Sequence, residues 1–165
     1  MRRDGTDRQI LTPDTKGSDT HPAACGRDLV VFRSARDGQF DLYVMRSDGS
    51  DVRRLTNDPG NEMFPVCSPD GGRIAFISDR DKPGSRLHEV YFANLAQGLT
   101  NLTRVTNNNV QEGHPGFSPD GAWLVFTSEA VESMMRSRSC SRWYSELNPT
   151  GRCMPITSRN VARSG

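Results

Sequence analysis

The sequence predicts an all-β fold, an incomplete β-propeller built from four-stranded antiparallel blades and followed by an irregular C-terminal tail. Three observations predict it: a segment that occurs twice, a unit of nearly constant length, and short apolar runs separated by turn residues. The segments "FPVCSPDGGRIAFISD" (64–79) and "HPGFSPDGAWLVFTSE" (114–129) agree at seven of sixteen positions. The agreement falls on turn residues and on their spacing, so the repeat reports architecture before function.

The repeat extends beyond these two segments and has a period of 43 to 50 residues. Two sets of equivalent residues define it: Pro22, Pro65 and Pro115, and Phe32, Phe76 and Phe126. The interval between the second and third units is longer than that between the first and second, and most of its extra residues lie in one loop, "DRDKPGSRLHEV" (79–90). A period of this length is typical of propeller blades, in which insertions are confined to loops.

Each unit has the pattern of four short strands. The second strands (28–34, 73–78 and 122–128) are apolar on successive residues, which indicates that both faces of the sheet are covered. The units predict a partial blade at 1–12, whole blades at 21–56 and 64–106, and a partial blade at 114–128, within one repeat domain at 1–129. No helix is expected before residue 129. A sandwich of similar strands is the alternative architecture.

A turn with a defined sequence joins the first and second strands. Its residues suit a type I turn, in which proline favours the second position and glycine the fourth. We therefore interpret both copies as structural: Ser68, Pro69, Asp70 and Gly71, and Ser118, Pro119, Asp120 and Gly121. The sequence has no Gly-x-Ser-x-Gly elbow, so no catalytic residue is predicted.

The amino-acid composition narrows the classes of function that are expected for this protein. The net charge of +1 gives no global field toward nucleic acid, and no apolar run predicts membrane insertion. The four cysteines lack the spacing of a zinc site. We expect isolated, partly buried thiols, no metal and no cofactor.

Two histidines are candidate ligand-binding residues. His21 and His114 share one repeat position, before proline on the innermost strand, where side chains can line a central channel. Imidazoles there can meet a metal or an anionic ligand, although Phe64 takes this position in the intervening unit and separates them. Hydrogen-bonded rim residues are the alternative interpretation. His88 lies in the inserted loop with no evident partner.

Charged residues after the second strand are a weaker candidate site. Asp37, Asp79 and Asp81 could hold calcium, but without a D-x-D-x-D-G run we favour turn capping. Arg36 and Arg80 occupy equivalent positions and are expected to pair with neighbouring acids at the surface.

The repeated motifs resemble the TolB-like family of β-propeller repeats. The matching pieces are "SARD" (34–37), "SDRD" (78–81), "DLY" (41–43), "DGS" (48–50) and "LT" (55–56). This resemblance covers residues 1–129. It implies a propeller, commonly six-bladed, in bacterial envelope proteins that bind partners, hence a non-catalytic scaffold with a protein partner and a periplasmic parent. Two alternatives stay open: a propeller domain of a serine peptidase without its catalytic domain, and a metal-dependent lyase or hydrolase with its site in the channel.

About three blade equivalents cannot close a ring of four to eight blades. Open sheet edges therefore predict self-association, for example of two arcs.

The pattern stops after Glu129. Residues 130–165 hold six Arg, seven Ser and no Asp. We interpret them as an aberrant or disordered tail, and a reading-frame slip is one hypothesis for its origin. An alternative is a degenerate third and fourth strand, because Tyr144 precedes Ile156-Thr157 by the same interval that separates Tyr43 from Leu55-Thr56.

Overall fold

The computed structural model describes residues 4–13, 16–96, 98–129, 144–147 and 153–155. These residues form twelve strands in three four-stranded antiparallel sheets, which confirms the predicted all-β class. The first sheet contains β1 (Asp19–Cys25), β2 (Leu29–Ser34), β3 (Asp41–Arg46) and β4 (Arg53–Arg54). The second contains β5 (Glu62–Cys67), β6 (Arg73–Ser78), β7 (Glu89–Leu95) and β8 (Leu99–Arg104). The third contains β9 (Glu112–Phe117), β10 (Leu124–Ser128), β11 (Tyr144–Leu147) and β12 (Cys153–Pro155).

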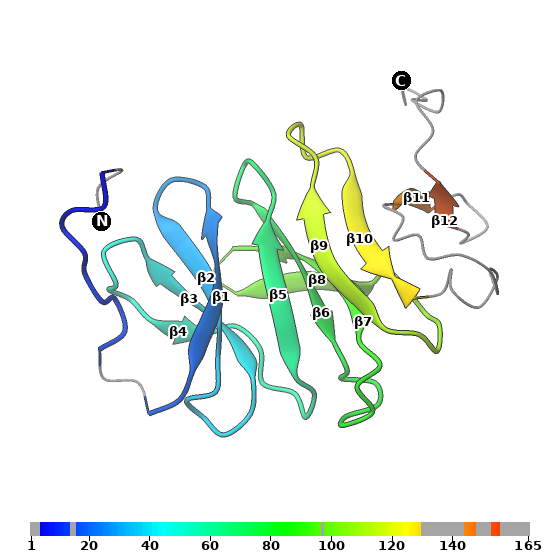
Figure 1. Cartoon of the computed structure of the whole chain (residues 1–165), viewed down its shortest axis with the longest axis horizontal. Coiled ribbons are helices and arrows are strands. Elements are labelled where there is room, and N and C mark those ends of the chain that lie inside the picture. Colours follow the sequence, from blue (N-terminus) through cyan, green and yellow to red (C-terminus); the bar gives the residue numbers. More distant parts are fainter. Residues whose placement is uncertain (1–3, 14–15, 97, 130–143, 148–152, 156–165) are drawn as a thin grey trace.

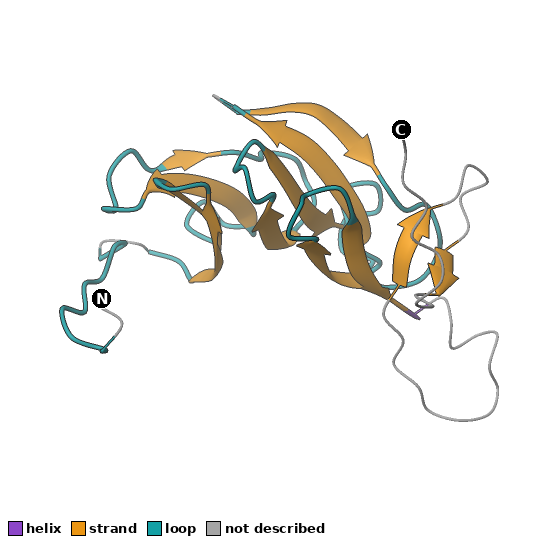
Figure 2. Cartoon of the chain, turned by 90° about the horizontal axis from the view of Figure 1, so that it is seen from above, coloured by secondary structure: helices purple, strands orange, loops and turns teal. Residues whose placement is uncertain are grey.

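The order of strands within each sheet follows the chain, and the first strands of successive sheets adjoin one another. β1, β5 and β9 therefore form the inner side of an arc that does not close into a ring (Figures 1 and 2). This arrangement confirms the predicted incomplete propeller. None of the described residues forms a helix with the length and hydrophobicity needed to cross a membrane.

The same strand register recurs in all three sheets. Phe32 lies opposite Tyr43 and Phe76 lies opposite Tyr91. In the third sheet, Phe126 lies opposite Tyr144 of the tail. The structure therefore departs from the predicted disordered tail at β11 and β12, and its register matches the alternative of a degenerate third and fourth strand. The other tail residues lie outside the described part of the chain.

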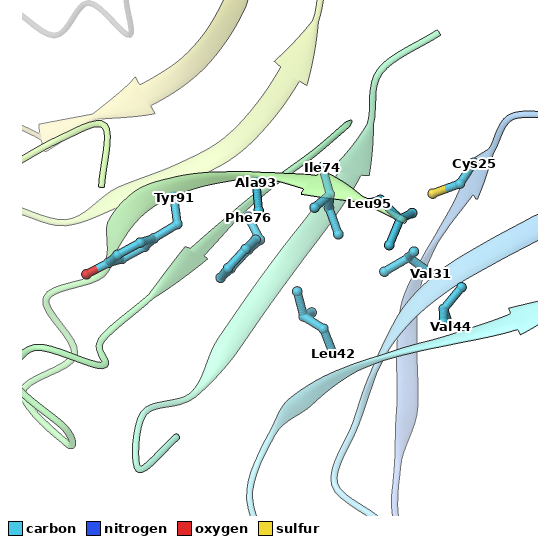
Figure 3. Close-up of a cluster of buried hydrophobic side chains, with 9 residues drawn as sticks. All are labelled: Cys25, Val31, Leu42, Val44, Ile74, Phe76, Tyr91, Ala93 and Leu95. Atoms are coloured by element: carbon cyan, nitrogen blue, oxygen red, sulfur yellow. The ribbon is translucent and has the colours of Figure 1, made fainter. Parts of the chain in front are cut away.

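The main core lies between the first and second sheets (Figure 3). Val31, Leu42 and Val44 of the first sheet pack in one cluster with Ile74 and Phe76 of the second, and all five side chains are fully buried. Their successive neighbours Ala75 and Ile77 are also fully buried, as the uninterrupted apolar run predicts. Burial of each large side chain contributes about 1.5–3 kcal/mol, so these inter-sheet contacts stabilise the fold substantially.

A second cluster joins the second sheet to the third. Ile77 and Val90 pack there with Phe126, and Met63 and Leu124 contact them at the edge. The second sheet thus gives one face to the first sheet and the other to the third, which is why its strand β6 has no exposed polar face.

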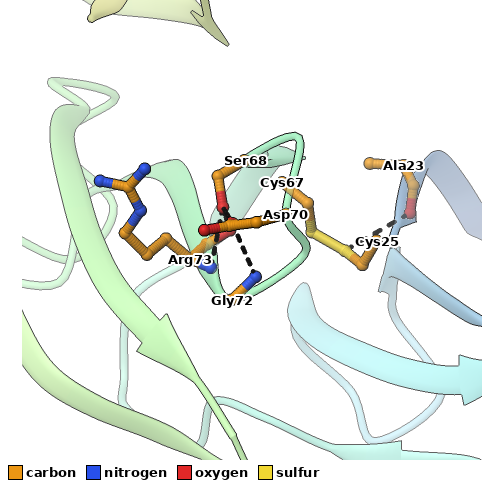
Figure 4. Close-up of a disulfide and its surroundings, with 7 residues drawn as sticks. All are labelled: Ala23, Cys25, Cys67, Ser68, Asp70, Gly72 and Arg73. Atoms are coloured by element: carbon orange, nitrogen blue, oxygen red, sulfur yellow. Dashed lines mark hydrogen bonds between the residues drawn. A yellow bond between two sulfur atoms is a disulfide. The ribbon is translucent and has the colours of Figure 1, made fainter. Parts of the chain in front are cut away.

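A disulfide links the inner strands of the first two sheets (Figure 4). Cys25 ends β1 and Cys67 ends β5, with Cα atoms 5.2 Å apart, well within the range that a disulfide spans. The prediction of isolated thiols was therefore wrong for this pair. Their separation of 42 residues is close to one repeat period. The cysteines are not at identical repeat positions, because Ala24 pairs with Val30 as Cys67 pairs with the equivalent Ile74, so an alignment of the two units does not match them.

Candidate functional site

The three inner strands share an unusual backbone conformation at one position. His21, Phe64 and His114 have φ values of 51°, 50° and 45°, in the left-handed region. Each residue precedes a proline, where extended backbone is normally favoured, and none is glycine. At each position the pairing with the second strand shifts register, as in a β-bulge. Such bulges re-aim a side chain, here in the same way on three neighbouring strands.

The bulged residues form a continuous row of rings, which we call the rim row (His21, Phe64 and His114). The ring centroids of His21 and Phe64 lie 4.6 Å apart with an interplanar angle of 87°. Those of Phe64 and His114 lie 4.3 Å apart at 35°. The sequence treats Phe64 as an interruption between two histidines, whereas in the structure it is the central member that both histidines contact.

The surroundings of the first histidine of the row favour its neutral form. Burial lowers the pKa of His21, and the nearby charges of Arg33 and His114 lower it further. Its Nδ1 lies 3.0 Å from the Thr20 hydroxyl oxygen.

A pocket of about 210 Å³ opens beside the row. His114 and Phe64 form part of its lining. The remaining lining comes from the start of β9 and the end of β10: Gln111, Glu112, Gly113, Thr127, Ser128 and Glu129.

Behind the row, a buried carboxylate connects the second sheet to the first. Glu62 is fully buried and accepts hydrogen bonds from the hydroxyls of Thr56 (2.7 Å) and Ser78 (2.8 Å). Arg80 donates to the same carboxylate at 3.1 Å and to Asp58 at 3.0 Å. The serine and arginine of the Ser-x-Arg motif and the threonine of the Leu-Thr motif thus all donate hydrogen bonds to one buried carboxylate.

The equivalent acid of the third unit is less well satisfied. Glu112 is 1% exposed, and its Oε1 accepts from the Ser128 hydroxyl (3.0 Å) and the Asn108 amide (2.6 Å). Its Oε2 is buried and has no hydrogen-bond partner among the residues that the structure describes. Burial raises the pKa of Glu112 to about 7. Sequence reasoning missed Glu62 and Glu112, although their identical repeat position was a signal.

The predicted pairing of the arginines is confirmed, with one correction. Arg36 pairs with Asp19 at 3.0 Å and Arg80 with Glu62. These pairs are not simple surface contacts, because the Arg80 side chain is only 14% exposed and its partner Glu62 is 0% exposed.

The aspartates of the predicted calcium or capping cluster separate into two roles. Asp79 accepts from the backbone amides of Asn61 (2.6 Å) and Gly84 (2.9 Å), which is a capping role. Asp37 and Asp81 instead accept from the phenol groups of Tyr43 and Tyr91. Within the described ranges, no group of three His, Cys, Asp or Glu side chains has the arrangement of a metal site.

His88 in the inserted loop was expected to have no partner, and the structure corrects this expectation. This side chain is 6% exposed, and its Nδ1 lies 3.2 Å from Gln111 Oε1 and 3.1 Å from the Arg86 carbonyl oxygen. His88 therefore has partners and joins the loop to the third unit.

The two Ser-Pro-Asp-Gly turns contain the hydrogen bonds that are expected of a turn with these residues. Gly71 donates its backbone amide to the Ser68 carbonyl at 2.8 Å, and the Ser68 hydroxyl bonds the Asp70 carboxylate. Ser118 and Asp120 repeat this arrangement. Gly71 has φ +74°, and a Cβ there would lie 2.6 Å from the backbone nitrogen of Gly26, so the turn also packs closely against the first sheet.

Comparison with known proteins finds relatives that match parts of this chain. No protein-family profile matches the chain. A TolB homolog of Chlorobium luteolum is 32% identical over 74 residues, which are 45% of this chain and 17% of that protein. An uncharacterized protein of Agrobacterium fabrum is 39% identical over 49 residues, or 30% of this chain and 17% of that protein. The chain thus matches under a fifth of the length of these relatives.

Solved structures agree on the fold. A putative TolB from Agrobacterium tumefaciens superposes with a TM-score of 0.64 at 23% identity, covering 88% of this chain and 50% of that one. TolB from Acinetobacter baumannii gives 0.63 at 19% identity, covering 86% and 32%. The tricorn protease also gives 0.63, at 21% identity, covering 85% of this chain and 13% of the protease.

The sheets, their shared register and these superpositions define an incomplete β-propeller. Parts of the chain are similar in sequence to TolB homologs, and the fold is similar to that of solved TolB structures.

Proposed function

We propose that the chain is a non-catalytic scaffold that binds a protein partner at the rim row. One observation carries this proposal: three neighbouring strands hold His21, Phe64 and His114 in the same strained conformation, with their rings in contact. A non-glycine residue in this region costs on the order of 1–3 kcal/mol and clusters at ligand sites. Folding alone does not require this cost three times, whereas a preorganised binding surface does.

Aromatic rings on a rigid frame are suited to protein recognition. They provide large contact areas with little loss of side-chain entropy, and such residues dominate binding energies at interfaces. The TolB relatives support a scaffold role. A hydrolase propeller shares this fold, but no feature of the rim row favours it.

The proposal is tested by replacing Phe64 with a photo-crosslinking phenylalanine analogue in the full chain. Irradiation in an extract of the cells that make the protein should yield a discrete adduct. Leu102 on the outer strand β8 is a matched control, because it is apolar and 44% exposed but distant from the inner strands. His21→Ala and His114→Ala should reduce the adduct at position 64. Equal yields at positions 64 and 102, or no adduct at 64, would contradict the proposal.

We also propose that the open end of the arc drives self-association. The outer face of the first sheet carries Phe32, Tyr43 and Met45, and Leu11 is the apolar residue packed over them. In the second sheet, the equivalent Phe76 and Tyr91 are covered by a whole neighbouring sheet. The side chains on the outer face of the first sheet are only 3–6% exposed beneath Leu11, so a second copy that supplies such a sheet would take the place of the Leu11 segment over this face. Sedimentation should show a discrete dimer, and a monomer at all concentrations would reject the idea.

A further inference from the structure

The pocket beside the rim row has the chemistry of a cation site. Glu112 and Glu129 both line it, together with the rings of Phe64 and His114. Glu112 is almost completely buried, and no group in the described part of the chain donates a hydrogen bond to its Oε2. A buried carboxylate oxygen without a donor is costly, so a ligand that supplies a donor gains that free energy on binding.

The other two units show which donor an acid in this position takes. In the second unit, the guanidinium of Arg80 reaches Glu62 and also lies over aromatic rings, 5.3 Å from the Phe76 centroid and 4.7 Å from that of Tyr91. In the first unit, Arg36 pairs with Asp19 and lies 4.7 Å from the ring centroid of Tyr43. Both acids are therefore paired with an arginine that also contacts rings.

The third unit retains the acid but not the arginine. By sequence, Arg36 and Arg80 correspond to Ala130, which carries no charge. The described residues provide Glu112 with neutral donors alone, the Ser128 hydroxyl and the Asn108 amide. In the first two units this acid binds an arginine of the chain itself. In the third unit, Glu112 is therefore available to a guanidinium group from another molecule.

We propose that this pocket binds the guanidinium group of an arginine side chain presented by a protein partner. This inference rests on the proposed function, because Phe64 and His114 belong to both the rim row and the pocket. The volume of about 210 Å³ is below the roughly 300–1,000 Å³ of small-molecule sites, so it suits one side chain and not a cofactor. Guanidinium groups bond carboxylates in a planar fork and stack on aromatic faces, whereas an ammonium is a compact, strongly hydrated charge.

The test uses N-acetyl-L-arginine amide as the probe, titrated into the isotopically labelled full chain and followed by NMR. The backbone amides of residues 111–114 and 127–129 should shift at millimolar probe. The citrulline amide has nearly the same shape without the charge and should bind at least tenfold more weakly. The lysine amide should fall between them.

Two variants locate the binding. Glu112→Gln keeps the shape of the side chain but removes its charge, and should weaken binding at least tenfold. Asp28→Asn removes one exposed negative charge outside the pocket lining and should leave binding unchanged. Because Glu112 is buried, Glu129→Gln provides an exposed second variant, with an expected loss of about twofold to fivefold.

The outcomes separate this inference from the proposed function. Equal binding of the arginine and citrulline amides, or undiminished binding by Glu112→Gln, would overturn the guanidinium site. An adduct at position 64 with no arginine binding would do so as well, while leaving the rim row as a binding surface. Arginine binding without any adduct at position 64 would overturn the protein partner.

Discussion

The guanidinium of Arg80 lies 3.1 Å from the carboxylate of Glu62, which has no solvent-exposed surface. This contact joins the end of β6 to the start of β5, and Asp58 from the connection after β4 binds the same guanidinium at 3.0 Å. One ion pair therefore holds three chain segments at the boundary between two sheets.

We expect Arg80→Met to destabilise the chain by about 3 kcal/mol or more, because it leaves Glu62 buried without its cation. Because methionine should still pack against Phe76 and Tyr91, the loss of unfolding free energy measures the removed charge more than any lost packing. Urea unfolding measures it, with the exposed Arg46→Met as the control, expected within about 0.5 kcal/mol of the wild type. Equal stability of the two variants would show that the buried pair contributes nothing.

Stability should fall as pH rises from 5 to 8. Burial raises the pKa of Glu62 and of Glu112 to about 7, above the value of about 4.3 in an unfolded chain. A raised pKa means that the folded state holds the proton more tightly. Its stabilisation is complete below about pH 4 and is lost as pH rises through 7. Each acid contributes at most on the order of 3 kcal/mol.

Glu112→Gln should make the pH dependence of the unfolding free energy shallower, as measured by urea unfolding at pH 5, 6, 7 and 8. Asp70 and Asp120 do not obscure this window, because hydrogen bonds from Ser68 and Ser118 lower their pKa values and move their titration to more acidic pH. A profile that is flat, or that rises toward pH 8, contradicts the raised pKa values.

Reduction of the Cys25–Cys67 disulfide should destabilise the chain by roughly 4 kcal/mol, the loop-entropy value for a bridge spanning 42 residues. Thermal unfolding with and without a reductant measures the effect, and Cys140→Ser with Cys153→Ser keeps the pairing unambiguous. Adding Cys25→Ala and Cys67→Ala to that background should abolish the response to reductant. Peptide mapping that finds both thiols free under oxidising conditions would refute the bridge.

The fold was predictable because its signals are local and repeated. The paired Pro, Ser-Pro-Asp-Gly and Phe positions fix the strand boundaries, and the apolar run at 73–78 fixes burial on both faces. The register of Phe126 with Tyr144 was available only as an alternative, since the tail lacks the other repeat marks.

The candidate site was predictable in part. A shared repeat position identified His21 and His114, but ring contacts across three strands depend on how the sheets pack, so the central position of Phe64 was not evident. Glu62 and Glu112 were missed for a related reason. From the sequence alone, an acidic residue at the start of a strand is expected to be solvated. Its burial depends on the packing of the neighbouring sheet, which the local sequence does not reveal.

The missing cation of the third unit provides the last prediction. Ala130→Arg should lower the pKa of Glu112 and raise the unfolding free energy at pH 8 by about 1–3 kcal/mol, the value of a hydrogen bond to a charged group. The close approach of chain segments limits this gain. A Cβ on Gly60 would lie 2.5 Å from the Arg80 Cα, and the third unit has Val110 at the position equivalent to Gly60. Val110→Gly together with Ala130→Arg should therefore stabilise more than Ala130→Arg alone.

The control for this pair is Ala130→Gln, which adds a polar side chain of some length without the charge and should leave the pKa of Glu112 near 7. Carbon-13 NMR of the Glu112 carboxyl gives the pKa directly, and urea unfolding at pH 8 gives the stability. The arginine variant should also lose affinity for N-acetyl-L-arginine amide, because its own guanidinium competes for the same oxygen. If the pKa of Glu112 stays near 7 in both arginine variants, the third unit does not share the acid–arginine arrangement of the other two.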